Sequence, residues 1–162
     1  MLSRIHYPGA FTHSAWLSAD GRTLYVLDEL VNAPVRIFDV SSPADPRLVG
    51  TYQPRLGTIP HNLLVRDGTT AYLADYKNGV EVLDVSDPRR PRLLGFYDTH
   101  PGVARDDGWN TPGGGASRAP VPAHEKEGGV YEGAWGVHWD DAGRIVVSDL
   151  TSGLFVLRYT GP

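Results

Sequence analysis

The sequence of 162 residues contains no cysteine and a single methionine. The absence of cysteine excludes a disulfide framework and any metal site built on thiolates. The sequence also lacks an apolar run of about 18 residues, the length of a membrane-spanning helix, so we expect no transmembrane segment. The opening stretch, "MLSRIHYPGAFTHSAW", lacks the apolar segment of an export signal, which predicts a cytoplasmic protein if Met1 is the true start.

An excess of positive charge is absent as well. The formal net charge is −4, and the lysines and arginines are scattered along the chain. Nucleic-acid binding depends on clustered basic side chains that neutralise phosphates. We therefore expect no nucleic-acid partner.

Glycine and proline, in contrast, are abundant, with 19 and 13 residues, which favours short strands joined by tight turns. Two segments are close copies of each other: "VRIFDVSSPADPRLVGTY" at 35–52 and "VEVLDVSDPRRPRLLGFY" at 80–97. In each copy two apolar-alternating runs flank an Asp-Val-Ser-x-Pro turn. Asp39 and Asp84 open these turns, where a carboxylate accepts turn amides, so we interpret both residues as structural.

The repeat extends to larger units at 12–52, 60–97 and 131–162. The first two units contain four short runs rich in Val, Leu, Ile and Tyr, and the third contains three. A period of about 45 residues with four strands per unit is typical of a β-propeller blade. The sequence thus predicts an all-β fold of about three antiparallel meanders, in which residues 1–11 form the outer strand of a preceding or closing blade.

Three blades do not close a ring, because propellers use about four to eight. We therefore expect a partial propeller, or half of a ring that is completed by self-association. Residues 100–130 break the period with a Gly-, Pro- and Ala-rich insertion. We interpret this insertion as a surface loop.

The two turn motifs, "FDVSSPADPRLVGTY" and "LDVSDPRRPRLLGFYDT", resemble those of LVIVD-repeat propellers. The succession "THSAWLSADGRTLYVLDE", "PHNLLV", "AYLADYKNGVEVLDVSDP", "GAWGVHW" and "SGLFVLR" is similar to the C-terminal half of the bacterial proteins called choice-of-anchor B. The resemblance covers nearly the whole chain. It implies that the full-length form is longer, exported and located outside the cell or at its surface.

Hairpin geometry singles out one set of polar residues. The spacing around the turns at Asp20-Gly21 and Gly68 places His13 opposite Asp28 and His61 opposite Asp75. Because innermost strands line a propeller's channel, the two pairs are expected to converge near its axis. Imidazole and carboxylate suit a divalent ion such as Zn, Mn or Ca, or an acid–base role.

The third unit keeps the acid at Asp149 and lacks the histidine, since the matching position lies beside Trp135. Two interpretations stay open: a bound ion or ligand, or aspartates that only accept hydrogen bonds from nearby backbone amides. In the first interpretation the metal ligands are His13, His61, Asp28 and Asp75. The expected axial ligand surface comprises His13, Asp28, Glu29, His61, Asn62, Asp75, Tyr76, Trp135 and Asp149.

These observations support two functional hypotheses. The first is a non-catalytic binding or scaffold module whose axial face takes a protein, a glycan or a small molecule. The second is a metal-assisted hydrolase or related enzyme with its His/Asp site at the channel. The sequence contains no motif of an established enzyme class.

Overall fold

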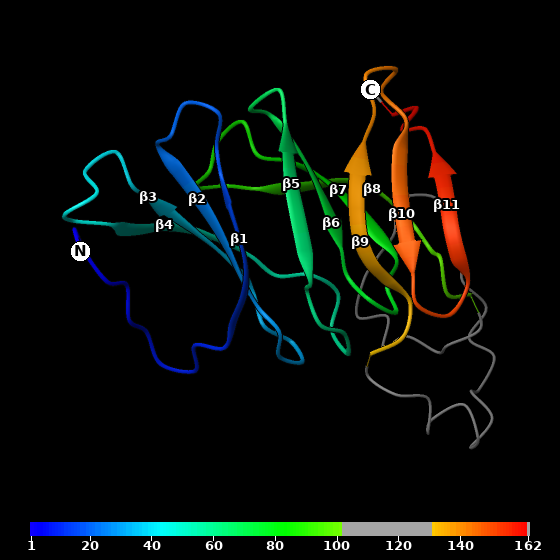
Figure 1. Ribbon diagram of the computed structural model, residues 1–162, viewed down its shortest axis with the longest axis horizontal. Coiled ribbons are helices and arrows are strands. Elements are labelled where there is room, and N and C mark those ends of the chain that lie inside the picture. The colour runs from blue at the N-terminus through cyan, green and yellow to red at the C-terminus, as the bar shows by residue number, and fades with distance from the viewer. Residues whose placement is uncertain (102–130, 162) are drawn as a thin grey trace.

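A computed structural model describes residues 1–101 and 131–161. All regular structure in this part of the chain is β, in three antiparallel sheets, which confirms the predicted fold class (Figure 1). No helix in these two ranges is long and apolar enough to span a membrane. The strands are β1 (Thr12–Leu17), β2 (Thr23–Asp28), β3 (Val35–Asp39), β4 (Arg47–Tyr52), β5 (Asn62–Arg66), β6 (Thr70–Ala74), β7 (Val80–Asp84), β8 (Arg92–Tyr97), β9 (Ala134–Trp139), β10 (Ile145–Asp149) and β11 (Gly153–Leu157).

Each sheet is a meander in which consecutive strands are neighbours. The first blade has the order β1-β2-β3-β4, the second β5-β6-β7-β8, and the third β9-β10-β11. The outer hairpins of the first two blades share a register shift, at Ile37/Phe38 and at Val82/Leu83. The sequence repeat is therefore a structural repeat down to the position of a β-bulge. The predicted insertion at 100–130 lies almost entirely outside the described residues.

The Asp-Val-Ser-x-Pro turns are held by their aspartates, as expected. Asp39 accepts a hydrogen bond from the amide of Ser41, and Asp84 accepts bonds from the amide and the hydroxyl of Ser86. The Ser86 hydroxyl is the main reason that the pKa of Asp84 falls to about 2. The repeated motif thus makes a turn.

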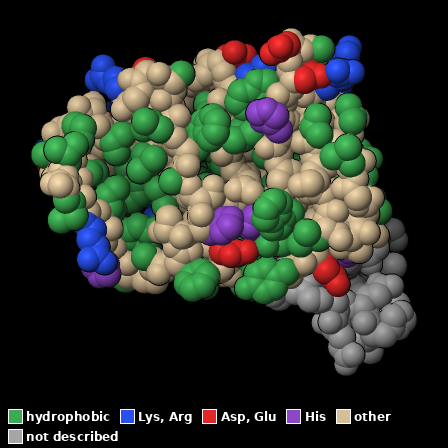
Figure 2. All heavy atoms as spheres, viewed as in Figure 1, with side chains coloured by type: hydrophobic (Ala, Val, Ile, Leu, Met, Phe, Trp, Pro, Cys, Tyr) green, Lys and Arg blue, Asp and Glu red, His purple; other side chains and the backbone are tan. Residues whose placement is uncertain are grey.

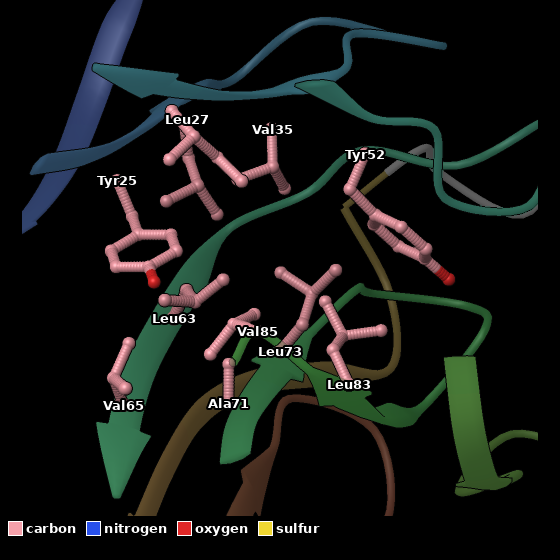
Figure 3. Close-up of a cluster of buried hydrophobic side chains, with 11 residues drawn as sticks. Tyr25, Leu27, Val35, Tyr52, Leu63, Val65, Ala71, Leu73, Leu83 and Val85 are labelled. Carbon is pink, nitrogen blue, oxygen red and sulfur yellow. The ribbon is translucent and has the colours of Figure 1, made fainter. Parts of the chain in front are cut away.

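The blades pack face to face through two buried apolar clusters. In Figure 3, Tyr25, Leu27 and Val35 of the first blade face Leu63 and Leu73 of the second. The other cluster lies between the second and third blades. Since both faces of the second blade are covered, β6 and β7 are buried along nearly their whole length, and full burial of a large apolar side chain there contributes about 1.5–3 kcal/mol.

Residues 1–11 form no strand in the structure. They lie against the first blade instead. The hydroxyl of Tyr7 and the amide of Phe11 donate hydrogen bonds to Asp28, and the Tyr7 ring stacks under the guanidinium of Arg36. The sequence predicts this segment as the outer strand of a preceding or closing blade; in residues 1–101 and 131–161 no strand pairs with it.

The innermost strands lie side by side, with β5 between β1 and β9 (Figure 1). Aromatic contacts join the starts of these strands: the His13 and His61 rings are 4.0 Å apart, and the His61 and Trp135 rings 4.9 Å apart, measured between centroids. Three blades therefore meet at one end of the inner strands. We call this the axial end.

Candidate functional site

At the axial end the structure brings together two imidazoles and one carboxylate. Nδ1 of His13 lies 3.5 Å from Oε2 of Glu29, and Nε2 of His61 lies 3.6 Å from Oε1 of the same carboxylate. All three ligand atoms lie within 4.8 Å of one another. We call His13, Glu29 and His61 the axial cluster; it is the one group of three or more metal-ligating side chains in residues 1–101 and 131–161.

Local backbone geometry places the first two members. Thr12 pairs with Asp28 and Ser14 with Leu27, so His13 is the extra residue of a β-bulge. Bulges re-aim a side chain, and this one turns His13 toward the second blade. Glu29 follows β2 directly, and its amide donates to the carbonyl of Phe11 at 3.1 Å.

His61 precedes β5 and is held by all three blades. Its amide donates to the carbonyl of Ala74 at 3.0 Å, and its Nδ1 lies 2.6 Å from the carbonyl of Trp135. A carbonyl only accepts, so Nδ1 carries the proton and Nε2 presents its lone pair toward Glu29. Burial lowers the pKa of His61, since its side chain is 1% exposed, and a neutral ring is favoured.

Glu29 is oriented from the second blade. The hydroxyl of Tyr76 donates to Oε1 of Glu29 at 2.9 Å, and burial followed by this bond raises the pKa of the tyrosine. Tyr76 therefore acts as a neutral donor. The backbone φ of Tyr76 is positive at 38°, a conformation that is costly for an aromatic residue and that is concentrated at functional sites.

The third blade fixes that conformation. Tyr76 and Ala134 exchange two backbone hydrogen bonds, each of 2.9 Å. Gly133 makes the close approach feasible, because a Cβ there would collide with the Tyr76 carbonyl. The axial end is thus a junction between blades. The second blade orients Glu29 of the first, and the third blade orients His61 and Tyr76 of the second.

The surface around the axial cluster is aromatic and polar. Asn62 donates to the carbonyl of Trp135 at 3.0 Å, and the Trp135 residue is 43% exposed. Tyr131 and Phe11 are more exposed still. Figure 2 shows histidine, acidic and hydrophobic side chains gathered on one face, over the lower ends of the inner strands.

Two of the predicted ligands lie elsewhere. The expected register of His13 with Asp28 is wrong by one residue because of the bulge. Asp28 is buried, forms an ion pair with Arg36 and accepts bonds from Tyr7, Phe11 and Thr12. It holds the N-terminal segment and β3 to the first blade.

For the second pair the register is as predicted, since Asn62 pairs with Ala74. Asp75 nevertheless turns toward its own loop and accepts a hydrogen bond of 2.8 Å from Asn78. Asp149 accepts bonds from the amides of Thr151 and Ser152, at 2.8 and 2.7 Å. The carboxylate of the cluster is therefore Glu29, and Asp28, Asp75 and Asp149 lie outside it.

Sequence reasoning had placed Glu29, Asn62 and Tyr76 on the polar surface, and the structure puts all three at the axial end. Sequence reasoning did not predict that Trp135 contacts the cluster through its backbone carbonyl, which accepts the hydrogen bond from Nδ1 of His61. No residue-type pattern reports a carbonyl contact between two blades. The sequence also gives no indication of the β-bulge that turns His13 toward the second blade.

Comparison with known families identifies two segments, residues 20–54 and 67–99, as LVIVD repeats. They span β2–β4 and β6–β8, the strands that share the repeated turn and register shift. No curated protein sequence matches the chain. The protein is thus an all-β chain that carries LVIVD repeats, a repeat family associated with β-propeller folds.

Proposed function

We propose that this LVIVD-repeat protein is a non-catalytic binding module whose ligand site is the axial end. The observation that carries the proposal is the convergence there of side chains from all three blades. His13 and Glu29 come from the first blade, His61 and Tyr76 from the second, and Trp135 from the third. Ligand sites combine an exposed aromatic surface with a few fixed polar groups in this way.

The opposite end of the inner strands offers a weaker alternative. A cleft of about 570 Å³ lies there between the first and second blades, among the β-turns. Three of its four carboxylates serve those turns, since Asp20, Asp39 and Asp87 each accept the amide of a residue two positions later. The fourth, Asp67, pairs with Arg66. Groups committed to turns are poor ligand contacts, so the axial end is favoured.

The composition of the axial end argues for binding over hydrolysis. A hydrolase needs a general base beside its activated water. Within the described residues the one carboxylate of the cluster, Glu29, accepts the Tyr76 hydroxyl and faces both imidazoles, so it is already engaged by other groups of the cluster. The surface location implied by the resemblance to choice-of-anchor B proteins is part of the proposal.

Chemical-shift mapping of the isotope-labelled chain tests the binding role. The probes are monosaccharides, disaccharides and amino acids, small polar molecules that have a face able to stack on indole. We expect at least one class to shift the signals of Trp135 and Tyr76, and Trp135→Ala to weaken that binding at least tenfold. The control Leu154→Ala changes a residue 68% exposed on β11 and leaves binding unchanged.

Binders that map to the cleft at the opposite end, or that bind Trp135→Ala as well as the wild type, would overturn this assignment. The absence of any binder in the three classes would also count against it. Hydrolysis of p-nitrophenyl esters or phosphates that Glu29→Gln abolishes would favour the enzyme hypothesis instead.

A further inference from the structure

We infer that the axial cluster is a binding site for a divalent transition-metal ion of the zinc class, with Nδ1 of His13, the carboxylate of Glu29 and Nε2 of His61 as ligands. The inference rests on the proposed function only for the position of the site. It specifies a cofactor that the binding role does not require. It also joins two blades through one ion.

The first argument is that acceptors face one another in the cluster. With the Nδ1 proton of His61 on the Trp135 carbonyl, the Nε2 lone pair points at Oε1 of Glu29 from 3.6 Å. Tyr76 donates to that oxygen and leaves Oε2 to face His13 at 3.5 Å. A lone pair of His61 that faces a carboxylate oxygen is unfavourable without a cation between them, and a divalent ion at this point would satisfy both.

The second argument is the spacing of the ligand atoms. Nitrogen and oxygen ligands about 2.0–2.1 Å from a tetrahedral ion lie about 3.3 Å from one another. The two imidazole–carboxylate distances, 3.5 Å to Oε2 and 3.6 Å to Oε1 of Glu29, are close to that value, and one ligand atom from each of the three residues lies within 4.8 Å of the others. Small side-chain adjustments would complete the geometry, because the side chain of His13 is 33% exposed.

The third argument is the support behind the ligands. Metal-binding histidines almost always donate their second N–H to a carbonyl or carboxylate, which fixes the tautomer and orients the ring. His61 does so to Trp135, and its ring packs edge-on against Tyr76 at 5.0 Å. Glu29 is oriented by the Tyr76 hydroxyl. Each of the two less exposed ligands therefore has a partner from another element.

The donor set selects the class of ion. Calcium and magnesium prefer oxygen ligands, whereas two imidazoles and one carboxylate suit zinc and its transition-metal neighbours. Three protein ligands leave one tetrahedral position open. The His13 side chain is 33% exposed, so we expect an exogenous ligand to reach the open position from its side.

Zinc titration of the full chain, stripped with a chelator, tests the site by calorimetry and elemental analysis. We expect one zinc ion per chain. Glu29→Gln and His13→Ala should each weaken zinc binding by at least about 10–100-fold, because loss of a residue that only supports a metal ligand already costs that much. Both positions are partly exposed, so these variants are expected to fold. Cobalt(II) bound in place of zinc should give the visible spectrum of a tetrahedral ion.

His138→Ala is the matched control. It removes an exposed imidazole from β9 that lies outside the axial cluster, and zinc binding should be unchanged. Substoichiometric binding, or zinc binding that survives in both ligand variants, would overturn the metal site. The two proposals fail separately: organic ligands that bind at Trp135 without zinc leave the binding role intact, and zinc binding without any organic ligand leaves the metal site intact.

Discussion

Two neighbouring positions in each blade behave differently. The first is the aspartate that follows or ends the second strand: Asp28, Asp75 and Asp149. Each of these carboxylates accepts hydrogen bonds from its own blade or from the segment that lies on it. The next position has diverged to Glu29, Tyr76 and Leu150. Glu29 and Tyr76 hydrogen-bond to each other across two blades.

This difference shows that repetition and function lie at separate positions of the blade. The repeated aspartates build the loop at the axial end, just as Asp39 and Asp84 build the turns at the other end. The residues that diverge between blades occupy the junction that the loops create. A site between blades needs different groups from each, so its residues are expected to escape the repeat.

Asp28→Ala should give the largest effect on stability. It removes one partner of a buried ion pair and leaves Arg36 unpaired, which costs about 3–5 kcal/mol of the free energy of unfolding. Glu29→Gln, one residue later, should cost less than about 1 kcal/mol. Urea denaturation of both variants measures the contrast. Equal losses would mean that the two positions do not divide structure from function.

Zinc should raise the free energy of unfolding, and this gain should depend on Glu29, the diverged position of the first blade. Zinc at 100 times its dissociation constant is expected to raise the free energy of unfolding of the wild type by about 2.7 kcal/mol. Glu29→Gln should gain little, while Asp149→Asn, which changes a repeated aspartate, should gain as much as the wild type. Thermal unfolding with and without zinc gives these values, and an equal gain in all three proteins would contradict the comparison.

Gly133→Ala should loosen the junction. A Cβ at this position would collide with the Tyr76 carbonyl, and φ is positive at 96°. Gly153 is a matched control because its φ is 90° and its Cβ would meet open space. Both substitutions carry the cost of the left-handed conformation, so the excess loss in Gly133→Ala, about 1–3 kcal/mol, isolates the close approach of the blades. Equal losses would show that the approach is unimportant.

The smallest effect concerns the repeated turn. Ser86→Ala removes the hydroxyl that does most to lower the pKa of Asp84, so that pKa should rise from about 2 toward the ordinary value. A carboxylate with a lowered pKa in the folded state stabilises the protein above its unfolded pKa, and this contribution disappears as the pH falls through the folded pKa. In Ser86→Ala this contribution should therefore be smaller, and its loss should be complete at a higher pH than in the wild type. Carboxyl titration by NMR measures the shift, while zinc binding stays unchanged.

The blades could be predicted from the sequence because their information is local. Apolar alternation, tight turns and the copied Asp-Val-Ser-x-Pro motif indicate strands, order and class without reference to distant contacts. The register of β5 with β6 follows from the turn alone. The unit that repeats in the sequence is the unit that folds.

The site was predicted only in part, because its contacts are not local. Hairpin counting pairs residues within a blade, and it assigned His61 to Asp75. The structure pairs His61 with Glu29 of the first blade and with the Trp135 carbonyl of the third. The relative placement of blades decides these contacts, and it depends on the packing of two apolar clusters rather than on any turn.

NMR of the imidazole nitrogens of His13 and His61 during a zinc titration tests the central claim most directly. We predict that free His61 carries its proton on Nδ1, and that zinc shifts Nε2 of His61 and Nδ1 of His13 together at one equivalent, while the nitrogens of His138 do not move. An Nε2-protonated His61, or zinc-induced shifts at His138 without shifts at His13 and His61, would contradict the account.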